Sequence, residues 1–322
     1  MEFPALCREE LAAELMKIKD PLIVMHVRPD GDTVGSAAAL CHIYAQLGVR
    51  ADLICADPIP SRLLFLTENC GAGKYSESKQ YTPIAVDVAS PSQLGCVATL
   101  ISPKIMIDHH GVGQAFAPHY IKTVSATGEI IADLAFFMLE NKYIREITPE
   151  LAEALYAAIS SDTGCFKYSN ASPETYRTAA RLLEFGADAA KINHLLFESK
   201  RIEQLRAEAL AVENMKLGAN GKISYTTVTF AEMQEKGIEP EDTDTMIEAA
   251  RCMEGTDIAF LVRQSGDREY KISLRSSGPD VASVAKIHGG GGHVRAAGCT
   301  LTADSTQDAV EILLPELEKL LL

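Results

Sequence analysis

The segment LIVMHVRPDGDTVGSAAALCHIYAQLG, residues 22–48, predicts a strand, a turn and a helix in direct succession. Its first six residues are an apolar run typical of a strand that is buried on both faces. Pro29 and Gly31 then force a turn. The Ala-rich stretch 34–47 is typical of a helix, and Gly48 is a common residue at a helix end. A buried strand followed at once by a helix is the unit from which parallel α/β sheets are built.

Further strands of the same sheet are predicted downstream. Short apolar runs recur at residues 51–55, 84–88 and 104–108. Helical patterns separate several of these runs, and an alternation of strands and helices indicates a parallel sheet. Residues 128–186 have mostly helical patterns. We therefore expect an N-terminal α/β domain with a parallel sheet at residues 1–188.

The second half of the chain has a different pattern. A charged helical stretch at 189–217 is expected to link the two halves. The elements expected beyond it are strands at 222–230, 258–263 and 270–275 and helices near 243–253 and 279–287. This order of elements predicts a smaller C-terminal α+β domain at residues 218–322.

Length and composition limit the class of protein. A chain of 322 residues is long enough for two domains, each with its own core. Hydrophobic residues make up 47% and charged residues 23%, which excludes collagen-like, coiled-coil and disordered chains. No window approaches about 18 consecutive apolar residues, and acidic residues interrupt the N-terminal stretch where an export signal would be apolar. We expect a cytoplasmic protein without a membrane partner.

The net charge and the cysteine pattern limit which binding partners and which kinds of cysteine site are expected. The formal net charge is −14, so an extended electrostatic grip on duplex DNA is not expected. A small anionic substrate stays compatible, because a few local cations or bound metal ions can reverse the field within one cleft. The eight cysteines include no CxxC pair, which favours reduced thiols over disulfides or a zinc site. Whether the chain forms a homodimer stays open.

Polar side chains gather where the predicted strands end. The residues concerned are His26, Asp30, Asp32, Asp87, Asp108, His109, His110 and Asp162. In open parallel sheets, ligands bind beyond the carboxyl ends of the strands. Unpaired charges buried in such strands would be costly, so these side chains need partners. Taken alone, Asp32 and Asp162 are equally well explained as carboxylates that cap helix ends.

Together, these residues have the composition of a metal site. The six candidate ligands are His26, Asp30, Asp32, Asp87, His109 and Asp162. Two imidazoles and four carboxylates without a thiolate suit two Mn²⁺ or Mg²⁺ ions better than a structural zinc ion. Two such ions about 3.5–4 Å apart would clamp a phosphoryl group and generate a hydroxide from a shared water. The predicted chemistry is phosphoester hydrolysis.

The order of these segments resembles that of the DHH phosphoesterases. The matching motifs are HVRPDGDTVGS (26–36), the strand end at Asp87, DHH (108–110) and SDTG (161–164). SLRSSG (273–278) and GGGGHVRAAG (289–298) resemble the DHHA1 substrate-binding domain of the same family. SATGEI (125–130) and LLEFGAD (182–188) match too, so the resemblance covers essentially the whole chain. One departure is GVGQAFAPHY (111–120), which lacks the Asn and Pro that often follow the triplet in relatives.

The resemblance implies roles for the matching residues. His26, Asp30 and Asp87 would hold one metal ion. Asp32, Asp87, His109 and Asp162 would hold the other, with Asp87 as the bridge. Asp108 would orient a ligand imidazole, and His110 would contact the scissile phosphate. The alternative for Asp108 and His110 is a structural hydrogen bond.

In the C-terminal domain, the resemblance implies a substrate-binding surface. The residues concerned are Arg275, Ser276, Gly290, Gly291, Gly292 and His293. An arginine fork suits phosphate, and glycines allow backbone amides to approach a nucleotide. The alternative for the glycine run is a flexible linker, although the apolar sequence on either side of it argues against one.

The family implies a two-domain hydrolase with its active site in the cleft between the domains. By length and domain content, the chain is most similar to members that combine oligoribonuclease and 3′-phosphoadenosine 5′-phosphate (pAp) phosphatase activity. We expect hydrolysis of short oligoribonucleotides, dinucleotides included, or of pAp, by attack of a metal-bound hydroxide with Mn²⁺, or alternatively Mg²⁺, as cofactor. The alternatives are a linear or cyclic dinucleotide phosphodiesterase, a polyphosphate or pyrophosphate hydrolase, and a nucleotide-binding sensor without catalysis. The presence of all six ligand residues argues against the sensor.

Overall fold

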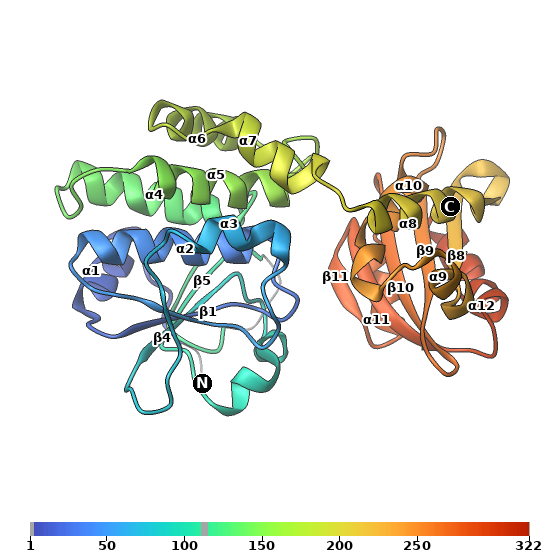
Figure 1. Ribbon diagram of the computed structural model, residues 1–322, viewed down its shortest axis with the longest axis horizontal. Helices are drawn as coiled ribbons and strands as arrows, with labels where there is room; N and C mark the ends of the chain where they lie inside the picture. Colours follow the sequence, from blue (N-terminus) through green and yellow to red (C-terminus); the bar gives the residue numbers. More distant parts are fainter. Residues whose placement is uncertain (1–2, 111–114, 322) are drawn as a thin grey trace. The chain divides into compact units, whose positions relative to one another are not determined.

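The structure is a computed structural model that describes residues 3–110 and 115–321 (Figure 1). The chain divides into two compact units, Met1–Ser199 and Lys200–Leu322. The division falls within the helical segment 189–217, since α7 (Ala189–Asn193) lies in the first unit and α8 (Ile202–Glu213) in the second. Among the described residues, no helix is long and apolar enough to cross a membrane. Residues 111–114, at the start of the segment that differs from the family pattern, lie outside the described residues.

A six-stranded sheet forms the centre of the first unit. In spatial order its strands are β3 (Gly73–Lys74), β2 (Asp52–Ile54), β1 (Pro21–Val24), β4 (Thr82–Val86), β5 (Ile105–Asp108) and β6 (His119–Ile121). Every neighbouring pair is parallel, which confirms the predicted parallel α/β fold. The two edge strands were not predicted, because segments of two and three residues are too short to show a periodic pattern.

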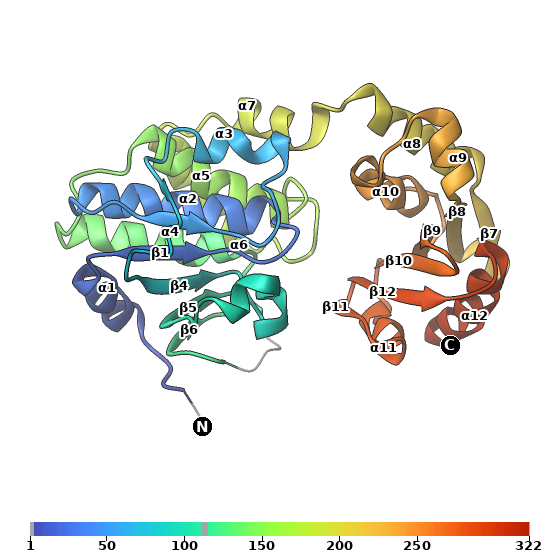
Figure 2. The ribbon, with the colours of Figure 1, turned by 60° about the horizontal axis from the view of Figure 1, so that its bottom comes forward.

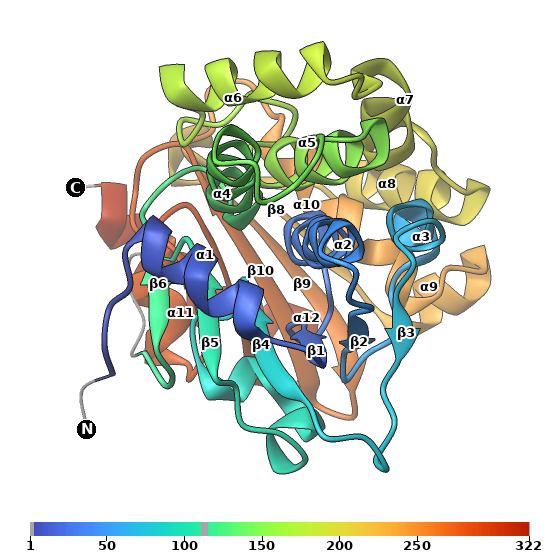
Figure 3. The same cartoon turned by 90° about the vertical axis from the view of Figure 1, so that its left-hand side faces the viewer.

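Helices lie on one side of this sheet in stacked layers (Figures 1 and 3). Besides α7, they are α1 (Arg8–Lys17), α2 (Gly31–Gln46), α3 (Leu64–Thr67), α4 (Thr127–Glu140), α5 (Pro149–Asp162) and α6 (Pro173–Glu184), with short helical turns at 61–63 and 194–198. Apolar side chains of α1, α2, α4 and α5 share one core with Ile23 and Ile84 of the sheet. On the other face, Leu22 and Met106 pack against Leu94 of the helical turn Pro91–Thr99. Burial on both faces explains why these strands are apolar throughout.

The second unit contains a mixed six-stranded sheet (Figure 2). In spatial order its strands are β11 (Gly291–His293), β12 (Ala296–Thr302), β10 (Glu269–Ser276), β9 (Ile258–Gly266), β8 (Ile223–Val228) and β7 (Lys216–Gly218). Only the β8–β9 pair is parallel among these neighbours. The unit therefore has the α+β character that the sequence predicted, and the glycine-rich segment contributes a strand to it.

Helices pack on both faces of the second sheet. They are α8, α9 (Phe230–Lys236), α10 (Met246–Arg251), α11 (Val281–Ile287) and α12 (Thr306–Glu318), with helical turns at 219–221, 240–245 and 319–321. Residues of α8, α9 and α10 form a core with Ala259 and Leu261 of β9. Residues of α11 and α12 form the other core, which includes Phe260 and Leu274. Neighbouring residues of one strand thus enter different cores, as the two-residue period of a strand requires.

Candidate metal centre

The candidate ligands in the first unit lie at one edge of its sheet. His26 follows β1, Asp87 follows β4, and His109 follows β5. These three strands are adjacent and parallel, so their carboxyl ends meet at the same edge. Asp162 is the last residue of α5, which packs on α2 behind this edge. The parallel topology therefore collects side chains that are far apart in sequence.

One group of ligand atoms consists of His26, Asp30 and Asp87, whose donor atoms all lie within 4.8 Å of one another. The Nε2 atom of His26 is 3.6 Å from Asp30 Oδ1 and 3.4 Å from Asp87 Oδ2. The other ring nitrogen, Nδ1, is 2.8 Å from the carbonyl oxygen of Val27. A proton on Nδ1 would donate to this carbonyl and leave the Nε2 lone pair for a metal ion.

A second group consists of Asp32, His109 and Asp162, within the same 4.8 Å limit. The Nε2 atom of His109 is 3.9 Å from Asp32 Oδ2 and 3.6 Å from Asp162 Oδ2. It is also 3.4 Å from Asp87 Oδ1. One oxygen of Asp87 thus faces His26 and the other faces His109. Asp87 is placed between the two groups, in the position of a bridging carboxylate.

Asp87 occupies this position in a strained conformation. Its φ angle is 60°, in the left-handed region that residues other than glycine and asparagine rarely adopt. Its backbone N–H donates to the carbonyl of Ile107 at 2.9 Å, and its Oδ1 accepts from the Thr127 hydroxyl at 3.1 Å. The side chain is almost completely buried. Such a costly conformation persists only where the surrounding structure fixes it, as these hydrogen bonds do here.

Asp32 is held by the start of α4. Its carboxylate accepts from the backbone N–H groups of Thr127 at 2.7 Å and Gly128 at 2.8 Å. It also accepts from the Ser36 hydroxyl at 3.1 Å. These are donors at a helix N-terminus, where the helix dipole also favours negative charge. A Cβ at Gly128 would lie 2.3 Å from Cβ of Ala158, so only glycine lets α4 approach α5 this closely.

The helix-capping alternatives are resolved by this geometry. Asp30, and not Asp32, is the N-cap of α2, since its Oδ1 accepts from the N–H groups of Asp32 at 3.0 Å and Thr33 at 3.1 Å. Asp162 stands at the C-terminal end of α5, where the helix dipole disfavours a carboxylate. Capping of α2 therefore does not explain Asp32, which accepts from the N–H groups at the start of α4 instead. Capping does not explain Asp162 either, while Asp30 caps α2 and faces His26 at the same time.

Asp108 and His110 form a close pair beside the two groups. His110 Nδ1 lies 2.6 Å from Asp108 Oδ1, and Asp108 is almost fully buried. His110 Nδ1 is also 3.7 Å from Asp87 Oδ1. Burial opposes the charged imidazole, but the hydrogen bond and charge of Asp108, with the charges of Asp87 and Asp162, raise the pKa of His110. The pair thus favours a protonated imidazole at the edge of the centre.

The electrostatics of the centre call for additional positive charge. Burial and the charge of Asp87 raise the pKa of Asp32, and burial with the charges of Asp87 and Asp30 does the same for Asp162. Burial also opposes charge on His26 and Asp87. Hydrogen bonds of His26 to Asp30 and Asp87 reverse this effect and raise the pKa of His26 to about 11. The hydrogen bond from His26 and the charge of His109 lower the pKa of Asp87 to about 2.

The ion pairs of these carboxylates within the described residues involve imidazoles, not lysine or arginine. Several buried carboxylates a few ångströms apart, with imidazoles among them, form a donor set that divalent cations such as Mn²⁺ and Mg²⁺ fit. The residues are therefore suited to metal ions.

Two features of the centre were missed as such by the sequence analysis. The Thr127 hydroxyl and the N–H groups of Thr127 and Gly128 hold the carboxylates, but SATGEI was recognised only as a family match. Ser36, four residues after Asp32, lies one helical turn away from it and contacts it. Of these contacts, only the one between Ser36 and Asp32 could have been found from the residues themselves, because the two are four residues apart at the start of a predicted helix.

The candidate substrate-binding residues lie in the second unit. Arg275 on β10 and His293 on β11 are both paired with Ala296 of the intervening strand β12. Directly paired residues project to the same face of a sheet, so Arg275 and His293 share one face. Arg275 Nε is 3.5 Å from Glu248 Oε1 on α10. The Ser276 hydroxyl, in contrast, donates to the carbonyl of Pro279 at 2.5 Å and stabilises the strand end.

The glycine run is part of the sheet and not a linker. A Cβ at Gly290 would lie 2.1 Å from the carbonyl oxygen of Gly298, and one at Gly292 would lie 2.4 Å from that of Ala296. Gly292 also has a φ angle of 136°. Gly291 pairs with Gly298 in the β11–β12 hairpin. Close backbone packing therefore requires glycine at two of the three predicted positions.

The fold and the centre agree with the comparisons to known proteins. The model of the DHH family, N-terminal domain, matches residues 21–159, and the model of the DHHA1 domain matches residues 220–319. The chain belongs to the DHH family and combines its N-terminal domain with a DHHA1 domain.

Among its relatives is the bifunctional oligoribonuclease and PAP phosphatase NrnA of Thermus thermophilus. The two are 31% identical over 94% of this chain and 91% of the relative. The Bacillus subtilis protein of the same name is 24% identical over 92% of each chain. The crystal structure of an exopolyphosphatase-related protein from Bacteroides fragilis is 22% identical and has a TM-score of 0.88, with 97% of this chain and 95% of that one covered. This last likeness concerns the fold.

Proposed function

We propose that this protein is a metal-dependent phosphoesterase that hydrolyses short oligoribonucleotides, including dinucleotides, and pAp. The observation that carries the proposal is Asp87, placed between two groups of ligand atoms and facing an imidazole in each. The proposal is supported by the similarity to relatives named oligoribonuclease and PAP phosphatase over most of the chain. We also propose that the protein acts in the cytoplasm, where short RNA fragments arise.

His26, Asp30 and Asp87 would hold one divalent ion, and Asp32, Asp87, His109 and Asp162 the other. We propose Mn²⁺ as the native ion. Bound ions of this kind neutralise charge on phosphoryl oxygens and lower the pKa of a water molecule near the phosphorus atom. The protein itself contributes the fixed arrangement, because Thr127 and Gly128 hold two of the carboxylates through hydrogen bonds.

His110, oriented by Asp108, would act on the substrate directly beside the ions. With Nδ1 bound to Asp108, the Nε2 atom of His110 would contact a phosphoryl or leaving-group oxygen of the substrate. A protonated imidazole would donate a hydrogen bond there, and its proton could pass to the leaving oxygen. Asp108 would fix the tautomer and orientation of the ring. It is the positioning partner of His110 in this proposal.

The second unit would bind the rest of the nucleotide. Arg275 and His293, on one face of the sheet, would contact a phosphate or the sugar. Gly290, Gly291 and Gly292 would allow the backbone to approach the ligand. We expect Ser276 to shape the end of β10, because its hydroxyl already donates to Pro279.

The test is a direct comparison of substrates. The protein and Mn²⁺ are incubated in parallel with an RNA dinucleotide, pAp, a cyclic dinucleotide and polyphosphate, and the products are resolved by chromatography. We expect mononucleotides from the dinucleotide and AMP from pAp. Asp87→Asn serves as the inactive control. Turnover confined to the cyclic dinucleotide or to polyphosphate would replace the proposed substrates, and turnover equal to that of Asp87→Asn would remove the enzymatic proposal.

A further inference from the structure

The half of the second sheet formed by β10 and β12 has two very different faces. Tyr270, Ile272 and Leu274 of β10 are buried against the core that contains α11 and α12. The alternate residues of β10, namely Glu269, Lys271, Ser273 and Arg275, are exposed or half-buried. Their partners on β12 follow the same division, since Gly298 and Thr300 are not buried whereas Cys299 and Leu301 are.

Three cations lie on this second face. Lys271 and Arg275 are four residues apart on β10, which corresponds to about 13 Å along a strand. Arg263 of β9 is paired directly with Lys271. Arg263 lies on the face of Leu261 and Ala259, which is the face of Arg275. We call Arg263, Lys271 and Arg275 the basic stripe, and by register His293 lies on the same face beyond Arg275.

The second unit neutralises only part of the positive charge of the basic stripe. Like charges directly opposite in an antiparallel pair are destabilising, yet Lys271 faces Arg263. Within the described residues, Lys271 and Arg263 have no ion pair and no side-chain hydrogen bond. Arg275 has Glu248 at 3.5 Å. Burial lowers the pKa of Arg263, and the negative charge of Asp244 offsets only part of this effect.

Small residues separate the cations of this face, and an acidic residue lies at one end of it. Between the cations lie small residues, Ser273 on β10 and Gly298 and Thr300 on β12, and none of the three is buried. Glu269 lies two residues before Lys271 on the same face, and its carboxylate accepts from the Ser265 hydroxyl at 2.7 Å. An anion that follows the stripe from Arg275 therefore meets two cations and then a negative charge.

We propose that the basic stripe is an extended phosphate-binding track for oligoribonucleotides of more than two nucleotides. This inference rests on the proposed function, in which Arg275 contacts a phosphate or the sugar of the nucleotide. Lys271 and Arg263 contact the next phosphates of a longer single strand, which are too far along the chain to exist in a dinucleotide or pAp. Glu269 ends the track, so the gain from added nucleotides stops after three or four.

The test compares chain lengths in one protein. The value of kcat/KM is measured for RNA of two to six nucleotides with the wild type, Lys271→Gln and Arg263→Gln. We expect each substitution to lower kcat/KM about tenfold on a tetranucleotide and to leave pAp and the dinucleotide within twofold, since a charge-assisted contact to phosphate is lost only with the longer substrate. In the wild type, kcat/KM should rise from two to four nucleotides and then level off.

Lys216→Gln is the matched control. Lys216 is an exposed lysine on β7 of the same sheet, and its pairing with Tyr225 places it on the other face. This variant should behave as the wild type at every length. Thermal unfolding separates misfolding from lost contacts, because loss of one member of a like-charged pair should not lower the midpoint.

A binding measurement distinguishes failure of the track from failure of the proposed function. The affinity for a fluorescent, uncleavable phosphorothioate tetranucleotide is measured against salt concentration. Lys271→Gln should reduce the slope of log affinity against log salt by about 0.7, the value for one phosphate contact on a single strand. An unchanged slope, with equal kcat/KM at all lengths, overturns the track. If no RNA is cleaved, an unchanged slope still overturns the track. A reduced slope without cleavage supports the track and shows that RNA is not the substrate of the proposed function.

Discussion

Replacement of Thr127 by valine tests how the fold controls the metal centre. Thr127 is completely buried, and its hydroxyl donates to Asp87 Oδ1 at 3.1 Å. Valine has nearly the same shape and keeps the backbone N–H that Asp32 accepts at 2.7 Å. The substitution therefore removes one hydrogen bond to the Asp87 carboxylate and replaces the hydroxyl with a methyl group.

The expected magnitude follows from the charge on the acceptor. A hydrogen bond to a charged group contributes about 1.5–3 kcal/mol, and a buried acceptor left without its donor retains the cost of desolvation. Groups that orient metal ligands typically change metal affinity or activity by about 10- to 100-fold. We expect Thr127→Val to lower Mn²⁺ affinity and kcat/KM within this range. Thr127→Ser, which keeps the hydroxyl, should stay within about threefold of the wild type.

Two measurements check this prediction. Calorimetric titration gives the Mn²⁺ affinity, and initial rates on the best substrate give kcat/KM, both at a temperature well below the unfolding midpoint of each variant. The reasoning fails if Thr127→Val retains wild-type affinity and activity. It also fails if the serine variant loses as much as the valine variant, because the hydroxyl would then not be the group that matters.

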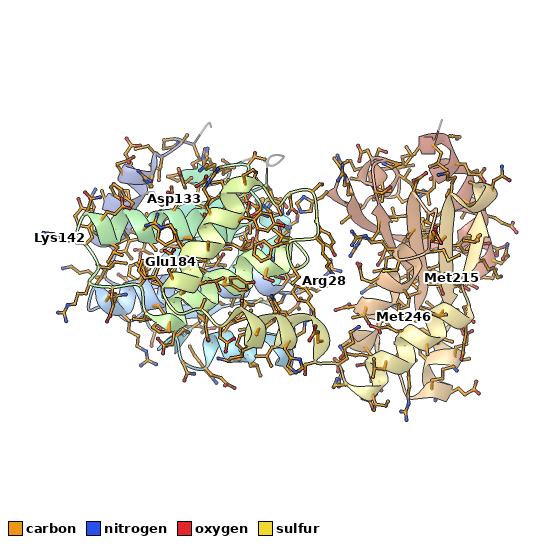
Figure 4. All side chains as sticks on the ribbon, turned by 90° about the horizontal axis from the view of Figure 1, so that it is seen from above. Arg28, Asp133, Lys142, Glu184, Met215 and Met246 are labelled. Atoms are coloured by element: carbon orange, nitrogen blue, oxygen red, sulfur yellow. The ribbon has the colours of Figure 1, made fainter. Side chains whose placement is uncertain are left out.

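Four other predictions follow from the same structure. Asp87→Asn should nearly eliminate turnover, whereas Asp108→Asn should lower kcat about 10- to 100-fold with normal metal content; equal and total loss would make Asp108 a ligand. Binding of Mn²⁺ at pH 7 should release protons, because the pKa of His26 is raised to about 11 and its proton must leave before the ring can bind a metal. Binding enthalpies that do not depend on the ionisation enthalpy of the buffer would contradict this. Lys142 is exposed after α4 and has a φ angle of 61°, which glycine adopts without strain (Figure 4). Lys142→Gly should therefore add about 0.5–1 kcal/mol of stability, measured as a higher urea midpoint with unchanged activity. A lower midpoint would show that the lysine side chain contributes contacts. Arg275→Ala should lose about 10- to 150-fold in kcat/KM on a dinucleotide but keep activity on a small chromogenic phosphodiester, and equal losses on both would assign Arg275 to the chemistry itself.

The sequence was sufficient for the centre of each sheet. Buried strands such as β4 and β9 are runs of apolar residues, and the turn around Pro29 and Gly31 separates a strand from a helix without ambiguity. The candidate ligands were also visible, because charged side chains at the ends of apolar strands need partners. The parallel pairing of β1, β4 and β5 brings them to one edge, as expected.

Other features depend on contacts that the sequence pattern does not contain. Asp30 and Asp32 are equally good capping residues, and only the path of the chain decides that Asp30 caps α2. The strand β11 was missed because four consecutive glycines have low strand propensity, and here close backbone packing in a hairpin overrides that propensity. The role of the Thr127 hydroxyl arises from a contact with a residue 40 positions away.

The wide sequence separation of the candidate ligands affects the order in which the protein matures. Four stretches of chain contribute to the centre, from His26 to Asp162, and Asp87 is oriented by a backbone hydrogen bond to the neighbouring strand β5. No short fragment contains a complete ligand group for both ions, and contacts between distant residues close late and slowly in folding. During synthesis, metal ions therefore find their full set of ligands only after α5 has left the ribosome and packed. Once they bind, they stabilise only the folded state, by an amount that grows with the free metal concentration. The supply of metal ions would thus set how long a newly made molecule survives, as well as how fast it works.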